Sequence, residues 1–202
     1  GAAAPRPQTG VRLYEAAAAV RTRAAEVLPG TVCDSLEAAV TGADIVIVCT
    51  PPGAMGAVGE AMAPFLKPGA IVSDTGSVKG AVVEAPVLPA NVHLVPAHPI
   101  AGTEQSGPDA GFASLFQGRW LILTPLDRPD PDYQAAVETV AGLWRDLGSS
   151  VEVMDVARHD LVLAMTSHIP HLIAFSVVAT AEDLETVTES EVVKYSAGGF
   201  RD

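Results

Sequence analysis

The run Asp44-Ile45-Val46-Ile47-Val48-Cys49, followed at once by Thr50-Pro51-Pro52, decides how this chain folds. Its apolar residues are consecutive and β-branched, without the alternation of a strand that has one face in water. Such a strand is typical of the centre of a parallel sheet that helices cover on both faces. The two prolines cannot donate to a ladder, so we expect the strand to end before them.

Strand and helix patterns alternate on both sides of this run. Strands are predicted at residues 11–15, 31–33, 44–49, 70–74, 92–96, 120–124 and 151–154. Helices are predicted at residues 16–28, 35–42, 53–65, 78–85 and 133–147. This alternation indicates an α/β fold with a parallel, Rossmann-like sheet. Only helical patterns follow Asp155, so we expect a sheet domain at 1–154 and the start of an all-helical domain at 155–202.

The glycine turn of a dinucleotide-binding sheet is absent from its expected place. Such a sheet opens with a strand, a G-x-G-x-x-G turn and a helix whose N-terminus holds the pyrophosphate. Nothing before Val11 fits that pattern. Glu15, however, ends a predicted strand, where the second strand of such a unit carries the acid that binds the ribose. We therefore expect a Rossmann-like sheet whose first strand–helix unit is missing from this sequence.

The composition narrows the classes of partner. The 202 residues are 49% hydrophobic and carry a formal net charge of −12. Nucleic acids and anionic membrane surfaces bind basic faces, so neither is expected as a partner. No apolar run is expected to reach the length of a membrane span, and residues 1–9 lack the apolar core of a signal peptide. The two cysteines form neither a disulfide framework nor a metal motif, which favours the reducing cytoplasm.

The segment His98–Gly107 is the leading candidate for a functional site. It follows the predicted strand at 92–96, whose pairing we expect Pro96 and Pro99 to end. A histidine beyond the carboxyl end of a strand lies at the edge of the sheet where α/β proteins bind ligands. The small, hydroxylated and acidic residues after His98 suit a loop that lines a substrate. The alternative is that His98 only caps a turn.

Three further histidines, His159, His168 and His171, fall in the predicted helical region. No carboxylate or cysteine at ligand spacing completes a metal site with them, so none is expected. Pro170 predicts a kink that opens backbone carbonyl groups of this helix toward the cleft. Arg158 and Lys79 are expected to be surface or helix-flanking charges.

Five motifs occur in order along the chain. They are Asp44–Pro52, Asp74-Thr75-Gly76-Ser77-Val78-Lys79, His98-Pro99-Ile100-Ala101-Gly102-Thr103-Glu104, Ser167-His168-Ile169-Pro170-His171 and Gly198-Gly199-Phe200-Arg201-Asp202. This series resembles the prephenate dehydrogenases and the related arogenate and cyclohexadienyl dehydrogenases. The Thr-Pro pair alone is common to many Rossmann dehydrogenases, whereas the third and fourth motifs are specific. The resemblance implies an NAD(P)-binding Rossmann domain, a helical domain that dimerises, and oxidative decarboxylation of prephenate to 4-hydroxyphenylpyruvate in tyrosine biosynthesis.

The resemblance also implies roles for individual residues. His98 matches the histidine that accepts the proton of the ring hydroxyl, and Ser77 matches a serine near hydroxyl and nicotinamide, although it equally suits an N-cap. The implied substrate contacts are Thr103, Glu104, His159, His171 and Gly198. The implied cofactor contacts are Glu15, Cys49, Thr50, Pro51, Asp74 and Thr75. Because an acid at position 15 repels a 2′-phosphate, NAD is favoured over NADP.

The sequence departs from the family pattern in two places. The glycine turn is missing, and the sequence stops at Asp202, before the arginine with which family members clamp a substrate carboxylate. We therefore expect weak or no activity from these residues alone, and an active, cytoplasmic homodimer from the complete protein. The choice between prephenate and arogenate stays open, as do the roles of Arg201 and His168.

Two functions of other classes compete with this interpretation. A 2-hydroxyacid dehydrogenase on a similar sheet would carry a catalytic lysine on the helix where this chain has histidines. A non-catalytic module would keep the sheet and bind an aromatic effector without a cofactor loop.

Overall fold

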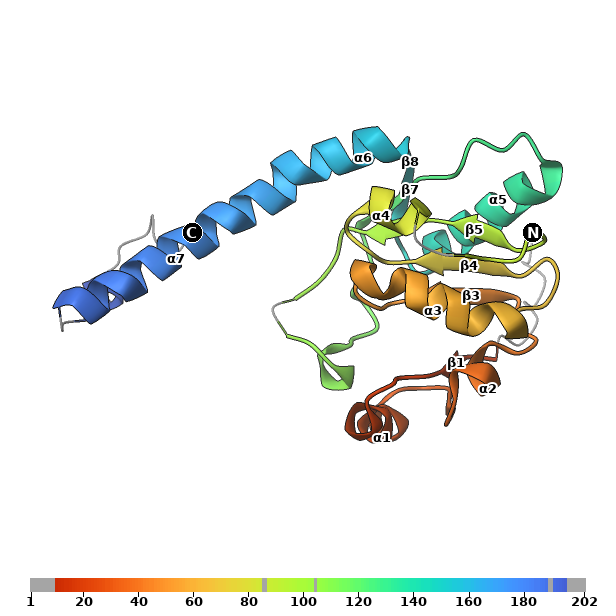
Figure 1. The fold of residues 1–202 in the computed structure, drawn as a ribbon, viewed down its shortest axis with the longest axis horizontal. Coiled ribbons are helices and arrows are strands. Elements are labelled where there is room, and N and C mark those ends of the chain that lie inside the picture. Colours follow the sequence, from red (N-terminus) through yellow and green to blue (C-terminus); the bar gives the residue numbers. More distant parts are fainter. Residues whose placement is uncertain (1–9, 85–86, 104, 189–190, 196–202) are drawn as a thin grey trace. The chain divides into compact units, whose positions relative to one another are not determined.

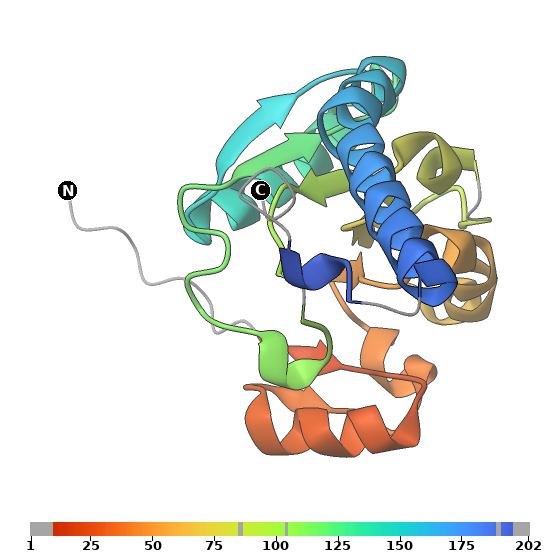
Figure 2. The same cartoon turned by 90° about the vertical axis from the view of Figure 1, so that its left-hand side faces the viewer.

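The computed structural model of the protein describes residues 10–84, 87–103, 105–188 and 191–195. Its contacts divide the chain into two compact units, with the boundary between His159 and Asp160. The first unit holds the strands, and the second holds most of a long helical segment (Figures 1 and 2). The predicted order, a sheet region followed by a helical region, is confirmed.

The strands of the first unit form three hydrogen-bonded groups. A parallel pair consists of β1 (Arg12–Leu13) and β2 (Thr31–Val32). A parallel group consists of β3 (Ile45–Val48), β4 (Ile71–Asp74) and β5 (His93–Val95). A mixed group consists of β6 (Ala97–Pro99), β7 (Trp120–Leu123) and β8 (Ser150–Val153).

Helices connect most of these strands, as the alternating pattern predicts (Figure 1). The α-helices are α1 (Ala18–Val27), α2 (Leu36–Val40), α3 (Met55–Met62), α4 (Lys79–Glu84) and α5 (Pro131–Asp146). Short 3₁₀ helices are η1 (Pro52–Ala54), η2 (Ala63–Phe65) and η3 (Pro108–Ala110). Parallel strands joined by helices make the Rossmann-like α/β fold that the sequence predicts.

The central strand of the parallel group is β4, not β3. All four residues of β4 are buried, whereas Ile47 of β3 remains 37% exposed. The continuous apolar run at 44–49 predicted a strand with neighbours on both sides, but within the described residues β3 pairs only with β4. The edge of β3 that faces β1 lies along a cavity.

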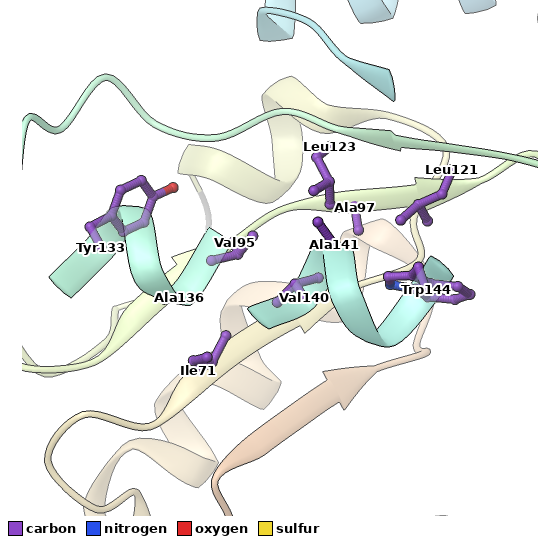
Figure 3. Packing of buried hydrophobic residues seen from close by; sticks show 10 residues of the cluster. All are labelled: Ile71, Val95, Ala97, Leu121, Leu123, Tyr133, Ala136, Val140, Ala141 and Trp144. Atoms are coloured by element: carbon purple, nitrogen blue, oxygen red, sulfur yellow. The ribbon is translucent and has the colours of Figure 1, made fainter. Parts of the chain in front are cut away.

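The two faces of the sheet pack against different helices, because alternate residues of a strand point to opposite sides. Ile71 and Val95 join a cluster with α5, whereas Val72 and Leu94 join a cluster with α2, α3 and α4. In Figure 3 the residues of α5 that pack over the strands are Tyr133, Ala136, Val140, Ala141 and Trp144. Helices therefore cover both faces of the sheet.

The chain changes partners between β5 and β6. β5 pairs in parallel with β4, and after Pro96 the chain continues as β6, which pairs antiparallel with β7. The prediction that Pro96 and Pro99 end all pairing is therefore wrong, and the sheet is not purely parallel. β6 lies at the edge of its group, where a strand tolerates a residue that has no N–H to donate. His98 consequently lies inside a strand rather than at the start of a loop.

The helical segment after β8 comprises α6 (Val156–Leu163), a π-helical turn (Ala164–His168) and α7 (Ile169–Thr188), followed by η5 (Val193–Tyr195). In the π turn the Ile169 N–H donates to the Ala164 carbonyl. Pro170 follows directly, and because its ring crowds the preceding turn, the helix widens there. The irregularity predicted at Pro170 thus takes the form of a π turn.

Among the described residues, the continuous helical segment Val156–Val187 is long and apolar enough to cross a membrane by length and composition. This corrects the expectation that no segment reaches that length. Serine, threonine and histidine residues interrupt the run, yet its mean hydropathy over 18 residues is 1.7. Only 6% of that window is buried in this structure. Helices that pack against another protein surface share these properties.

Tyr133 fastens α5 to the sheet. Its hydroxyl donates to the Leu94 carbonyl over 2.9 Å and accepts from the Leu126 N–H over 2.8 Å. Burial raises the pKa of the Tyr133 phenol, so the group stays protonated and able to donate.

The variant Tyr133→Phe leaves these two backbone groups without their partner. We expect the free energy of unfolding to fall by about 1–3 kcal/mol in urea denaturation, because buried polar groups would lose their hydrogen bonds. The control is Tyr14→Phe, since Tyr14 is 38% exposed and its ring can keep its contact with Arg21. Equal losses in both variants would contradict this account of Tyr133.

Candidate active site at the carboxyl edge of the sheet

The turns that follow β3 and β4 lie against each other. The two strands end level, because Val48 pairs with Asp74 in register. A Cβ added to Gly76 would lie 3.0 Å from Asp74 Oδ2 and 3.4 Å from the ring of Pro52. A side chain at position 76 would crowd both neighbours, so glycine permits the close approach. The second sequence motif therefore meets the end of the first at one edge of the sheet.

Cys49 and Thr75, two of the expected cofactor contacts, follow β3 and β4 at this edge, and the Cys49 thiol donates to the Ile47 carbonyl over 4.0 Å. The surrounding atoms desolvate the Cys49 thiol and raise its pKa, although part of the residue is exposed. The thiol is therefore uncharged at neutral pH and lines the edge as a neutral group rather than as a nucleophile.

Asp74 and Lys79 form a buried ion pair behind this edge, with side chains that are 1% and 0% exposed. Asp74 also accepts from two backbone N–H groups, that of Gly76 over 2.8 Å and that of Ala97 over 3.1 Å. Lys79 Nζ donates to the Ala97 carbonyl over 2.7 Å. The pair thus holds both polar backbone groups of the residue immediately before His98.

This geometry corrects two expectations. Lys79 is not a surface charge, because the turn after β4 brings it back onto the strand-end carboxylate. Asp74 does not have the exposed position that a cofactor contact requires, because its oxygens accept from protein groups. A lysine five residues after a strand-end aspartate is the sequence signal that could have indicated the pair.

His98 in β6 and His159 in α6 face each other across 2.9 Å, from Nδ1 to Nε2. The rings lie edge to face, with an interplanar angle of 66°. Asp155 begins α6 and so places His159: its Oδ1 accepts from the Arg158 N–H over 2.8 Å, and its carbonyl accepts from the His159 N–H over 3.0 Å. His98 keeps 9% of its surface exposed and His159 keeps none, so a ligand can reach only His98 of the two. The expected substrate contact of His159 does not fit this burial.

Ser77, expected to be catalytic, and the other expected substrate contacts lie on three different elements. Ser77 is exposed in the turn between β4 and α4, and His171 is exposed on α7 in the second unit. Thr103 is also exposed, and its Oγ1 accepts from the Gln105 N–H over 3.3 Å. Outside the described residues lie Glu104, Gly198 and Arg201.

A cavity of about 250 Å³ separates β1 from β3. All four residues of β3 line it, and because neighbouring strand residues point to opposite faces, the cavity must run along the edge of that strand. Glu15 and Thr50 line it near the strand ends. Thr50 Oγ1 is buried and has no hydrogen-bond partner among the described residues. Since buried polar groups normally bond, this hydroxyl is suited to a ligand.

The segment between β6 and β7 is tied to α1 by an ion pair. Arg23 Nε donates to both carboxylate oxygens of Asp109 in η3 over 3.0 Å, and η3 lies beside α1 in Figures 1 and 2. This bond with Arg23 lowers the pKa of the Asp109 carboxyl. The segment that carries Thr103 is thereby fixed beside Glu15, which shares a second cavity with Gly107 and Pro108.

We expect Arg23→Gln to loosen this segment without unfolding the protein. Chymotrypsin should cleave after Phe112 or Phe116 about two- to fivefold faster, because an exposed ion pair contributes little free energy to the fold but restrains the loop locally. Lys67→Gln, which breaks the exposed pair with Asp44, is the matched control. Equal cleavage rates in the two variants would contradict the tethering role of Arg23.

Comparisons with known proteins match nearly the whole chain. The family profile of the prephenate dehydrogenase nucleotide-binding domain matches residues 6–153, and that of the dimerization domain matches residues 155–202. The cyclohexadienyl dehydrogenase of Zymomonas mobilis is 44% identical over 199 residues, which cover 97% of this chain and 67% of the relative. The prephenate dehydrogenase of Bacillus subtilis is 35% identical over 134 residues, which cover 65% of this chain and 35% of the relative.

A solved structure gives the same result. Prephenate dehydrogenase from Aquifex aeolicus, in complex with hydroxyphenyl propionate and NAD+, superposes with a TM-score of 0.80 at 28% identity. The match covers 96% of this chain and 68% of that structure. The chain thus spans about two thirds of the Aquifex and Zymomonas proteins and about one third of the Bacillus protein.

Proposed function

Because the chain belongs to the prephenate dehydrogenase family, we propose that the whole protein converts prephenate to 4-hydroxyphenylpyruvate and CO2 with NAD+ as the oxidant. The observation that carries this proposal is the position of His98 at the edge of the sheet, beside the strand-end turns. The carbon that bears the ring hydroxyl is oxidised, and loss of the ring carboxylate makes the ring aromatic.

In this proposal His98 is the group that handles the proton. Its neutral imidazole accepts the proton of the ring hydroxyl as the carbon is oxidised, and returns it to the phenolic oxygen after CO2 has left. NAD+, held by the residues named below, would supply the acceptor for the hydride that leaves the same carbon. Ser77, exposed in the turn after β4, orients the hydroxyl toward His98. Because aromatisation drives the reaction, the protein mainly has to orient the groups.

The residues that would hold NAD+ fit the cavity at β3. Thr50 presents a buried hydroxyl that lacks a partner among the described residues, and Glu15 stands at the end of β1. A carboxylate there suits ribose hydroxyls and repels a 2′-phosphate, which favours NAD+ over NADP+. Pro51, Cys49 and Thr75 complete the proposed lining of the cofactor site. The Aquifex relative is a complex with NAD+, which supports NAD+ as the cofactor.

The gap between β1 and β3 suits one more strand. In dinucleotide-binding sheets with the strand order 3-2-1-4-5-6, the first strand stands between the second and the fourth. We propose that such a strand occupies the part of the cavity along Ile45–Val48, which leaves Glu15 and Thr50 near the strand ends for NAD+, and that its glycine turn brings backbone N–H groups to the pyrophosphate. The uninterrupted apolar composition of Ile45–Val48 supports a neighbour on that side.

The remaining contacts and boundaries are proposed from the resemblance. Thr103, Glu104, His171 and Gly198 are the proposed substrate contacts. The sheet domain is proposed to span 1–154 and the helical domain 155–202.

We also propose that the protein is a cytoplasmic homodimer that uses α7. The exposed apolar residues of this helix include Leu172, Ile173, Phe175, Val177, Val178 and Leu184. A continuous apolar surface marks an interaction site. The match to the dimerization-domain profile supports a second copy of the chain, rather than a membrane, as its cover. Light scattering of the whole protein should give a dimer, and sedimentation with lipid vesicles would contradict the proposal.

A panel of substrates tests the function. NADH formation by the whole protein is measured with prephenate or arogenate, and with NAD+ or NADP+. We expect the highest kcat/KM with prephenate and NAD+. A preference for arogenate would keep the chemistry and change the substrate, whereas binding of both ligands without any NADH would support a non-catalytic module.

A further inference from the structure

The pairing of His98 with His159 has a consequence for the proton that His98 must accept. A neutral imidazole carries one hydrogen, on either Nδ1 or Nε2, and only the other nitrogen can accept a proton. Nδ1 of His98 faces His159 Nε2 at 2.9 Å, so one of these nitrogens must donate and the other must accept. The nitrogen of His98 that would meet a substrate is therefore Nε2.

We propose that His159 is a positioning residue that keeps the hydrogen of His98 on Nδ1. With its own hydrogen on Nδ1, His159 accepts from His98 through Nε2, and the lone pair of His98 then lies on Nε2, which can accept the proton of the substrate hydroxyl. When His98 takes up the hydroxyl proton it becomes an imidazolium, and its bond to His159 becomes charge-assisted and stronger. This inference rests on the proposed function, and it assigns His159 a role other than substrate contact.

The surroundings of His159 fit a fixed acceptor. The ring is fully buried, so solvent does not compete for Nε2. The Asp155 cap fixes the first turn of α6, and the ion pair of Asp74 and Lys79 fixes the backbone before His98. Residues other than the two histidines therefore hold both rings in position. Such support by surrounding residues keeps an imidazole in one orientation and one tautomer.

A spectroscopic experiment tests the tautomer without any turnover. Long-range proton–nitrogen correlations of ¹⁵N-histidine-labelled whole protein, assigned with His98→Asn, report which ring nitrogen carries the hydrogen. We expect the Nδ1–H form of His98 in the wild type and a shift toward Nε2–H in His159→Phe, which keeps a ring but offers no acceptor. An Nε2–H form of His98 in the wild type would overturn the proposal, whether or not the protein is a dehydrogenase.

Kinetics of the same variants separate positioning from packing. We expect His159→Phe to lower kcat with prephenate about 10- to 100-fold with KM changed less than about threefold, because the substrate does not touch this ring. His159→Gln, whose amide oxygen can accept in place of Nε2, should recover most of the loss. Equal activity of the Phe and Gln variants would overturn the role, as would a wild-type kcat in the Phe variant. If His159→Phe does not fold, as judged by circular dichroism, the wild-type spectrum and the Gln variant decide the question.

Discussion

In the whole protein, His98→Asn is expected to lower kcat with prephenate by about 10²–10⁴-fold, the usual contribution of a positioned general base. The side chain of asparagine can keep a polar atom near the position of Nδ1, and hence the contact with His159. It has no counterpart of Nε2, which is the nitrogen that meets the hydroxyl. KM for NAD+ should stay within about threefold of the wild-type value, because the change does not affect the binding that the ground state and the transition state share. Steady-state NADH formation gives both parameters.

The matched control for this variant is His93→Asn. His93 lies in β5, five residues before His98, and its ring centroid is 6.1 Å from that of Tyr133. The change removes an imidazole from the same stretch of chain without touching the strand-end turns. We expect kcat to remain near the wild-type value. A similar loss in both variants would mean that imidazoles here support the fold rather than the reaction.

Lys79→Met is expected to lower the free energy of unfolding by about 3–5 kcal/mol, the usual cost of leaving one partner of a buried ion pair uncompensated. The Asp74 carboxylate would remain 1% exposed with two N–H donors but without its cation. The Ala97 carbonyl would also lose a donor, so the backbone before His98 would be less well fixed and kcat should fall as well. Urea denaturation and NADH formation measure the two effects.

A second variant shows whether the unpaired charge causes this loss. In the double variant Lys79→Met/Asp74→Asn the carboxylate charge is gone, so we expect the stability to recover part of the way. Lys67→Met breaks an exposed pair with Asp44 and should leave the unfolding midpoint unchanged. If the double variant is as unstable as the sum of the two single variants, the pair is not the source of the effect.

The sequence predicts the helices and strands of this fold well where interactions between neighbouring residues determine them. Most predicted strands and helices occur within a few residues of the predicted bounds, because apolar runs, glycine stops and caps act over short distances. At α5 the apolar spacing predicted a start at Tyr133, whereas the helix begins at Pro131 because Asp130 caps it by accepting from the Asp132 N–H. A helix start is misplaced by this amount when it is predicted from the stripe of buried residues and not from the capping residue.

The features that the sequence does not predict depend on contacts between distant residues. No pattern in the local sequence predicts that β6 pairs antiparallel with β7. A proline at position 99 by itself favours a break in the strand. The burial of Lys79 follows from the meeting of β4 and β6, and the contact of His98 with His159 joins residues 61 positions apart. The motif resemblance pointed to His98, but only the geometry shows that the ring of His159 lies against it.

The most direct measurement is a crystal structure of the whole protein with NAD+ and hydroxyphenyl propionate, the ligand pair named for the Aquifex relative. The account predicts the phenolic oxygen at hydrogen-bond distance from His98 Nε2, about 2.6–3.2 Å. It also predicts the nicotinamide ring beside the strand-end turns of β3 and β4, with the His159 contact retained at Nδ1. A phenolic oxygen bound away from His98, or a nicotinamide outside that edge of the sheet, would contradict it.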